Sequence, residues 1–146
     1  MSNVATPSLL GLELIKRSQG LSLEKYQDAD GLWIVGYGHL IRDQERFDGP
    51  ITLTQAELLF QQDVDYYHQV LHRCMQVPLN QHQSDALMLL AFSLGPEAVQ
   101  QSTIVREMNQ GHMADALALW QQQGSSQTSL ATQRQAEATL FRGDMR

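Results

Sequence analysis

Residues 80–95 place the strongest constraint on the fold, because they combine helical periodicity with apolar side chains on nearly every side. The segment follows Pro78, begins at Asn80, which can cap a helix, and ends at Gly95. A helix that is apolar all round has to be buried among other elements. We therefore expect a helical core built around this segment. Its apolar positions include Ala86, Leu87, Leu90, Ala91 and Leu94.

Amphipathic helices that could cover this core are predicted on both sides of it along the chain. One begins near Pro7 and ends by Gly20. A longer one begins at Thr52, where Thr52 and Gln55 have the spacing of a capping box. Gly124 to Thr128 should be a polar break between the last two helices. Shorter helices are expected over 96–101, 103–109, 113–122 and 129–142.

The pattern changes to that of β-structure between Gly20 and Thr52. Residues 23–27 alternate in polarity, residues 32–37 are β-branched and aromatic, and Asp-Ala-Asp-Gly at 28–31 is typical of a turn. The predicted fold class is therefore α+β and mostly helical. We expect one domain over 1–146, with a small β-hairpin lobe at about 21–51. The larger helical lobe takes about 52–146 plus the N-terminal helix, and a long helix joins the two lobes.

Charge and composition exclude several classes of function. Ten basic against sixteen acidic residues give a formal charge of −6, which argues against nucleic-acid binding. The longest apolar run, 86–94, has nine residues and contains Ser93, so we expect no membrane insertion. The first residues contain no basic segment, so we expect no secretory signal. The single Cys74 suits synthesis in the reducing cytoplasm, with export by another route still open.

No metal or other cofactor is expected. His68 and His72 are four residues apart, a spacing that can place two ligands on one helical face, but no third ligand accompanies them.

Several motifs, taken in order, resemble those of the phage-type lysozyme (endolysin) family, which includes the T-even phage enzyme. Residues 14–21 are followed by Tyr-Gln-Asp at 26–28, Gly31, and Ile-Val-Gly-Tyr-Gly-His at 34–39. The resemblance spans about residues 8–142 and implies a lysozyme-like two-lobe fold. It also implies cleavage of the glycosidic bond between the two amino sugars of peptidoglycan. Further matching segments are 60–65, 77–81, 91–95, 102–104, 109–111 and 137–141.

The resemblance also implies where the catalytic residues belong. The family uses a glutamic acid at the end of a helix, an aspartate nine residues later and a water-holding threonine six residues further on. Those positions hold Gln19, Asp28 and Ile34 in this chain. An amide cannot deliver the proton that the leaving oxygen needs, and isoleucine has no hydroxyl to position water. Only Asp28 keeps its family identity.

Other expected substrate-cleft positions differ from the family pattern as well. Gln133 aligns with a substrate-side arginine, and Ser93 aligns with an amide side chain that faces the sugar. An aromatic position of the family falls on Ser126 or Gln127. Asp30, Trp33 and His39 complete the predicted cleft set, and the resemblance implies an ion pair between His39 and Asp63.

Three functions remain open at this point. The first is a protein that has lost muramidase activity and binds either peptidoglycan glycan or a protein partner across the old cleft. The second is a weak muramidase that depends on Asp28. The third is a purely structural or interaction module. The charge of −6 weighs against a free lytic enzyme, because a polyanionic cell wall would repel it.

Overall fold

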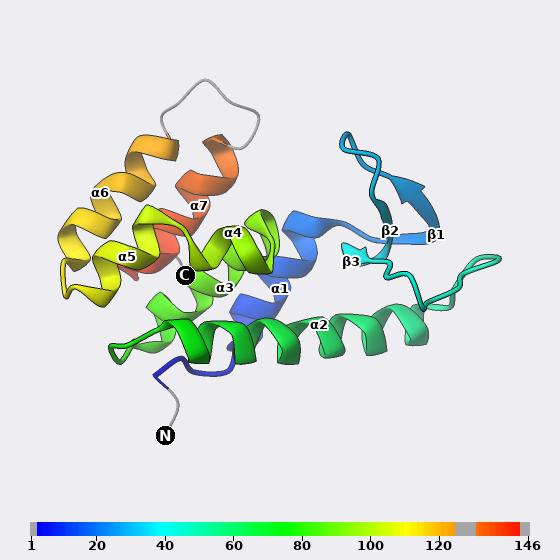
Figure 1. Cartoon of the computed structure of the whole chain (residues 1–146), viewed down its shortest axis with the longest axis horizontal. Coiled ribbons are helices and arrows are strands. Elements are labelled where there is room, and N and C mark those ends of the chain that lie inside the picture. Colours follow the sequence, from blue (N-terminus) through cyan, green and yellow to red (C-terminus); the bar gives the residue numbers. More distant parts are fainter. Residues whose placement is uncertain (1–2, 125–130, 144–146) are drawn as a thin grey trace. The chain divides into compact units, whose positions relative to one another are not determined.

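The computed structural model describes residues 3–124 and 131–143. Within these ranges the chain is mostly helical, with a small antiparallel sheet between residues 22 and 40 (Figure 1). None of the described helices is both long enough and apolar enough to cross a membrane. The helices are α1 (Leu9–Gln19), α2 (Leu53–Cys74), α3 (Gln81–Leu94), α4 (Pro96–Gln100), α5 (Thr103–Asn109), α6 (Met113–Gly124) and α7 (Ala131–Arg142), and the strands are β1 (Ser22–Gln27), β2 (Trp33–Gly36) and β3 (His39–Leu40).

The chain divides into two compact units. One comprises residues 1–15 and 67–146, here called the helical unit, and the other comprises residues 16–66, here called the hairpin unit. Helices α1 and α2 each contribute residues to both units. The hairpin unit extends beyond the predicted lobe of 21–51 because it includes the end of α1 and the first part of α2.

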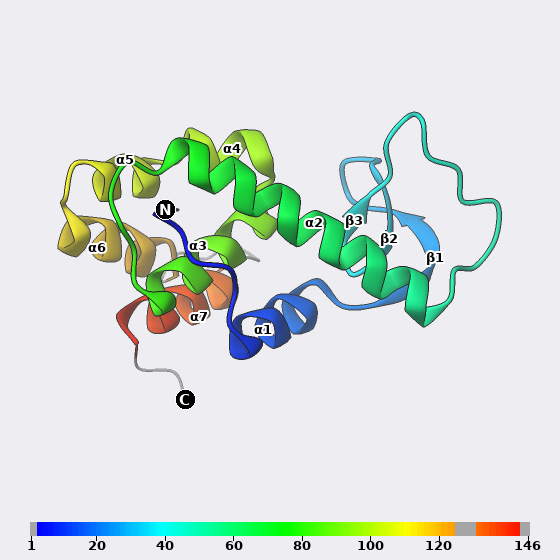
Figure 2. The same ribbon diagram turned by 90° about the horizontal axis from the view of Figure 1, so that it is seen from below.

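Helix α3 lies at the centre of the helical unit, as its sequence predicted. Its residues from Ser84 to Ala91 are all buried, and α7 packs along it. Figures 1 and 2 show α3 running among the other helices of this unit. The predicted cap is present, since the Asn80 side chain accepts from the Gln83 N–H and the Gln83 side chain accepts from the Asn80 N–H. Gly95 follows the helix with a φ of 94°.

Two polar residues of α3 are buried because they hold the N-terminal segment. Asp85, 2% exposed, accepts hydrogen bonds from the backbone N–H and the hydroxyl of Ser8. Ser84 accepts one from the Ala5 N–H at 3.0 Å. These bonds satisfy polar atoms that would otherwise be costly to bury beside an apolar core.

The hairpin unit contains a sheet with strand order β1–β2–β3, all antiparallel. Val35 on β2 is completely buried and packs with Ile51 and Ala56 into a small separate core. The predicted capping box at the start of α2 is confirmed, because Gln55 N–H donates to the Thr52 hydroxyl and Thr52 N–H donates to the Gln55 side chain. Tyr37, Ile41, Phe47 and Leu59 surround the core.

The observed elements agree with the predicted types and differ mainly at their ends. Helix α1 begins at Leu9 rather than near Pro7, and α6 continues to Gly124. The sequence pattern did not indicate β3, because two residues are too few to show alternation. Most of the predicted break at 124–128 and the predicted helix start at Ser129 lie outside the described residues.

Candidate functional site

Asp28 shapes the turn of the β1–β2 hairpin. Its Oδ1 atom accepts hydrogen bonds from the N–H groups of Asp30 (2.9 Å) and Leu32 (3.0 Å). This is the usual way in which an aspartate stabilises a turn with its own side chain. Gly31 completes the turn with a φ of 81°, and Asp30 is exposed. Asp28 is half-buried, and its hydrogen bonds to the backbone give it a structural role in the turn.

Gln19, the last residue of α1, packs its side-chain amide against the backbone of Gly38 between β2 and β3. A Cβ atom added at Gly38 would collide with Gln19 Oε1 and would lie 3.0 Å from its Cδ. Gly38 also has a φ of 73°, a conformation that other residues rarely adopt. The amide of Gln19 is therefore held against the hairpin, at the position that the resemblance assigns to the catalytic acid.

Ile34 lies in the middle strand, paired with Tyr26 on one side and Leu40 on the other. Directly paired residues point to the same face of an antiparallel sheet, so these three form one row of apolar side chains. Tyr26 is 41% and Leu40 is 46% exposed. The position expected to hold a water molecule is therefore occupied by hydrocarbon in an apolar row.

Trp33 precedes Ile34 and so points to the other face of the sheet. Its side chain is 44% exposed, and the Lys25 ammonium lies 5.1 Å from the ring centre. Such a cation–π contact is weak at an exposed site.

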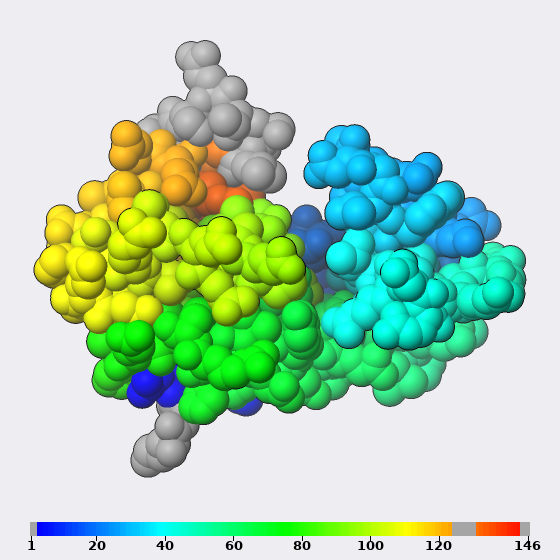
Figure 3. All heavy atoms as spheres, viewed as in Figure 1, coloured from blue at the N-terminus to red at the C-terminus, as the bar shows by residue number. Residues whose placement is uncertain are grey.

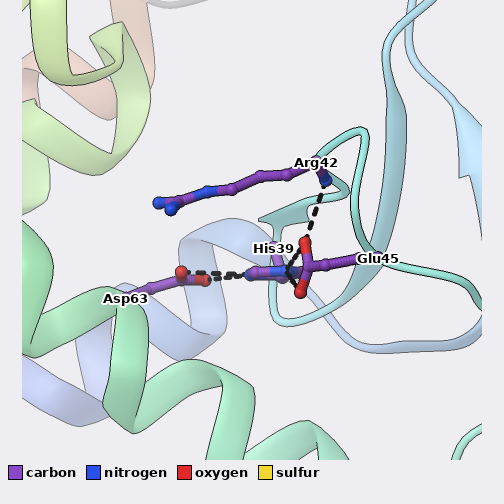
Figure 4. Close-up of polar contacts among 4 residues, drawn as sticks. All are labelled: His39, Arg42, Glu45 and Asp63. Carbon is purple, nitrogen blue, oxygen red and sulfur yellow. Dashed lines mark hydrogen bonds and ion pairs between the residues drawn. The ribbon is translucent and has the colours of Figure 1, made fainter.

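His39 is buried between two carboxylates (Figure 4). Its Nδ1 lies 2.9 and 3.0 Å from the oxygens of Asp63, and its Nε2 lies 3.0 Å from both oxygens of Glu45. Only the protonated ring can donate at both nitrogens. The ion pair with Asp63 is the one that the resemblance implies, whereas the contact with Glu45 was not predicted.

The pKa values of this cluster follow from its geometry. Burial favours neutral His39, but the hydrogen bonds and charges of Asp63 and Glu45 outweigh burial and raise the pKa of His39. Burial works against ionisation of Glu45 too, yet the hydrogen bond from the Arg42 N–H and the pairing with His39 lower the pKa of Glu45. The cluster therefore joins β3, the loop after it and α2 by charged hydrogen bonds.

A second ion pair joins the end of α1 to α2 inside the hairpin unit. The Lys16 ammonium donates to both oxygens of Glu57, at 3.0 and 2.8 Å, and the Tyr37 hydroxyl donates to the same carboxylate at 3.2 Å. The hydrogen bond from Lys16 is the main cause of the lowered pKa of Glu57.

The two predicted cleft residues of the helical unit meet in one polar network. Arg134, 3% exposed, donates to both oxygens of Glu137 and to the Ser93 hydroxyl. Gln133 donates to Glu137 at 2.8 Å, and the Trp120 indole donates to it at 2.9 Å. Burial raises the pKa of Glu137 although all of these donors favour its ionised form. Gln133 and Ser93 are thus both engaged by this buried pair.

The sequence reasoning did not identify Glu45, Arg134 or Glu137. The spacing of Arg134 and Glu137, three apart on a helix, was a usable signal for a pair. No local signal connects Glu45 to His39. The predicted aromatic position at Ser126 or Gln127 lies outside the described residues.

Two groups of side chains have metal-ligand chemistry. The first is the pair His68 and His72 on α2. His68 donates to the Val4 carbonyl at 2.7 Å, so the Nε2 atom of His68 already has a partner within the protein. Glu107, His112 and Asp115 have ligand atoms within 4.8 Å of one another, and all three are at least partly exposed. His112 and Glu107 are already joined by an ion pair of 2.9 Å, which accounts for their proximity.

Comparisons with known proteins agree on one family. The family model described as phage lysozyme matches residues 16–137. The endolysin of Acyrthosiphon pisum secondary endosymbiont phage 1 is 34% identical over 139 residues, which cover 90% of this chain and 94% of the relative. The endolysin of Salmonella phage P22 is 32% identical over 137 residues, with the same coverage.

Solved structures show the same similarity. The muramidase domain of SpmX from Asticaccaulis excentricus has a TM-score of 0.78 and 30% identity, covering 94% of this chain and 97% of that one. A P22 lysozyme mutant has a TM-score of 0.73 and 30% identity, covering 94% and 99%.

Proposed function

The chain belongs to the phage lysozyme family, and we propose that it is a member that binds its target without hydrolysing it. The observation that carries the proposal is that the Gln19 amide lies against Gly38. The resemblance assigns this position to the family's catalytic acid. General acid catalysis contributes about two to four powers of ten in rate. An amide cannot supply this contribution at any pH at which the protein is folded.

The other carboxylates support the loss of activity, because a general acid at neutral pH needs a raised pKa. In the hairpin unit, hydrogen bonds from the Arg42 N–H and from His39 lower the pKa of Glu45, and the hydrogen bond from Lys16 lowers the pKa of Glu57. In the helical unit, burial raises the pKa of Glu137. Glu137 is fully buried and receives hydrogen bonds from Trp120, Gln133 and Arg134, so it cannot reach a substrate.

A binding role is supported by the apolar surface of the hairpin unit. Eight of the ten exposed large hydrophobic side chains among the described residues belong to it. Tyr26 and Leu40 flank Ile34 in one apolar row of the sheet, and exposed apolar surface of this kind is characteristic of interaction sites. Peptidoglycan glycan, the substrate of the family, and a protein partner are the two proposed targets. In the hairpin unit, the contacts are assigned to Asp28, Asp30 and Trp33. The eight side chains are Leu21, Leu23, Tyr26, Leu32, Trp33, Leu40, Leu53 and Leu58.

The proposal includes synthesis in the cytoplasm, with export by another route where the target lies outside. Burial raises the pKa of the Cys74 thiol, which keeps it in its unreactive protonated form.

The retention of Asp28 favours one alternative, a weakly active lysozyme that hydrolyses the glycan of peptidoglycan. That enzyme would need an acid other than Gln19. Its activity would disappear in Asp28→Asn, whereas background lysis would not respond to this change.

Lysis of purified sacculi, followed as a fall in turbidity, tests the proposal. We expect the wild-type protein to clear no more than buffer. Gln19→Glu with Ile34→Thr should fold normally and show slight hydrolysis, limited by Gln133. Gln69→Glu is the matched control, since it makes the same chemical change at an exposed position of α2 in the helical unit. Wild-type lysis that is lost in Asp28→Asn would overturn the proposal in favour of the weak enzyme.

Binding is tested separately, by sedimentation with the same sacculi. Cosedimentation that Trp33→Ala weakens would identify glycan as the target. If the wild-type protein stays in solution, glycan binding is excluded and a protein partner remains as the proposed target. Protection of the backbone amides of β1–β3 from hydrogen exchange by a purified partner would then show that binding.

A further inference from the structure

The helical unit contains a pocket that belongs to none of the positions considered so far. It has a volume of about 320 Å³ and is formed by the segment after α2, the connection between α4 and α5, and α5 itself. In Figure 3 these segments lie together on the visible face, with α4 and α5 in yellow-green above the green end of α2. The volume falls at the lower end of the range for small-molecule sites.

Amide side chains dominate the lining. Gln76, Gln101 and Gln110 come from three different segments and meet at the pocket with Arg106. The side chains of these four residues make no hydrogen bond or ion pair to another residue in the described part of the chain. Their donors and acceptors are therefore available to a ligand.

The walls, by contrast, are held in place. Asn109 donates to the Cys74 carbonyl at 2.9 Å and accepts from the Gln76 N–H at 2.7 Å, which joins the end of α5 to the end of α2. Ser102 caps α5 by accepting from the Ile104 N–H. The backbone that carries the four exposed side chains is therefore fixed, whereas the side chains themselves become ordered on binding.

The charge of the pocket is unlike that of the chain. Although the sequence has sixteen acidic residues, none lines this pocket, and Arg106 is its single charged side chain. A guanidinium matches a carboxylate through two parallel hydrogen bonds. Each glutamine amide both donates and accepts, as a sugar hydroxyl does.

We propose that this pocket binds a sugar acid, with the carboxylate on Arg106 and the ring hydroxyls on Gln76, Gln101 and Gln110. The site is independent of Gln19 and Asp28 and does not require the proposed function to be correct. The sugar acid is either a free monosaccharide or a unit within a glycan. Both forms present the same chemistry to the pocket.

The test is a titration of ¹⁵N-labelled full-length protein followed by NMR. The probes are glucuronate, methyl glucoside (the ring without the charge) and acetate (the charge without the ring). Glucuronate should shift the backbone signals of residues 100–110 and the side-chain amide signals of Gln76, Gln101 and Gln110 with saturation. The expected Kd is about 1 mM, which is usual for a ligand of this size. Methyl glucoside should bind at least tenfold more weakly.

Two variants distinguish the pocket from general charge attraction. Arg106→Gln should weaken glucuronate binding at least tenfold. Arg73→Gln, an exposed arginine on α2 outside the pocket, removes the same charge and should leave the Kd unchanged. The proposal is overturned if glucuronate causes no saturable shifts there, if acetate binds equally well, or if both variants weaken binding alike. Repeating the titration with a uronate-containing oligosaccharide distinguishes a free sugar acid from one within a glycan. If the natural ligand is a glycan, the oligosaccharide should bind more tightly than glucuronate.

Discussion

His39 shows at the scale of a residue how one side chain can connect three segments. It lies on β3, pairs with Asp63 on α2 and pairs with Glu45 in the loop between them. Because the ring must be protonated to donate to both carboxylates, the connection depends on pH. Gln19 and Gly38 form a second residue-scale contact. The Gln19 side chain occupies the space that a Cβ atom at position 38 would need, so only glycine fits there.

We predict that the stability of the protein falls as the pH rises above 6.5. The pKa of His39 is raised in the folded state, so its contribution is complete below the unfolded pKa of 6.5 and is lost as the pH passes the folded pKa. His39→Ala should cost about 1–3 kcal/mol at pH 6 and less at alkaline pH. Urea unfolding at a series of pH values measures this.

His112→Ala is the control for that series, because its side chain is 52% exposed and its ion pair should add little to stability. Equal losses for the two histidines, or a loss at His39 that does not depend on pH, would contradict the assigned cluster.

Gly38→Ala should destabilise the protein more than Gly31→Ala. Both glycines have a positive φ, at 73° and 81°, so each substitution should cost about 1–2 kcal/mol in backbone strain. A Cβ at Gly31 meets nothing within 4 Å, whereas one at Gly38 meets Gln19. Chemical denaturation of both variants gives the difference. Truncation of Gln19 to alanine should remove most of the excess cost at Gly38, because only the Cβ of residue 19 then remains near it, at 3.2 Å. Equal costs at the two glycines would show that the amide does not pack there.

At the scale of elements, helix starts depend on local side-chain caps. Thr52 with Gln55 begins α2, Asn80 with Gln83 begins α3, and Ser102 begins α5. Each cap satisfies backbone N–H groups that have no partner inside the helix. Because α3 forms the centre of the helical unit, its cap should affect the whole protein.

Asn80→Ala should lower the free energy of unfolding by about 1 kcal/mol, because it removes the acceptor for the Gln83 N–H. Asn80→Asp keeps an oxygen acceptor and should stay within a few tenths of a kcal/mol of wild type. Thermal unfolding followed by circular dichroism compares the two. A loss of similar size in both variants would mean that the amide NH₂ group, and not the cap, stabilises α3.

At the scale of the whole molecule, each unit contains a network of charged groups, and in the helical unit this network is buried. Arg134 and Glu137 are almost completely buried in the helical unit and are bonded to Trp120, Gln133 and Ser93. Removing one partner of a buried pair leaves a charge without compensation, which costs more than removing both.

Arg134→Leu should therefore cost about 3–5 kcal/mol near neutral pH. The raised pKa of Glu137 means that stability falls as the pH rises from 4.5 through the folded pKa, and loss of Arg134 should raise that pKa further. The loss of unfolding free energy in Arg134→Leu should therefore be smaller at acidic pH. Adding Glu137→Leu should restore part of the stability that Arg134→Leu loses. Urea unfolding at pH 4.5 and 7 provides the measurement. A double variant no more stable than Arg134→Leu would contradict the network.

Local interactions explain which parts of this protein the sequence predicted. The helix caps, the Asp28 turn and the apolar circumference of α3 all join residues within about four positions of one another, so their chemistry can be read in order along the chain. The family motifs added the pair of His39 with Asp63 and the positions of Gln19 and Ile34. Strand β3 was missed because it exists only through its pairing with β2.

The remaining features required the tertiary structure, because they join residues distant in sequence or place side chains that have no pattern. Ser8 meets Asp85, 77 positions away, and Arg134 meets Ser93, 41 positions away. The glutamines of the polar pocket are scattered along the chain and become one lining only when α5 packs beside the end of α2. Sequence alone determined the helices, the β1–β2 hairpin and the amide at position 19, since all of these are local. Packing decided which polar groups are buried and paired and which remain available to a ligand.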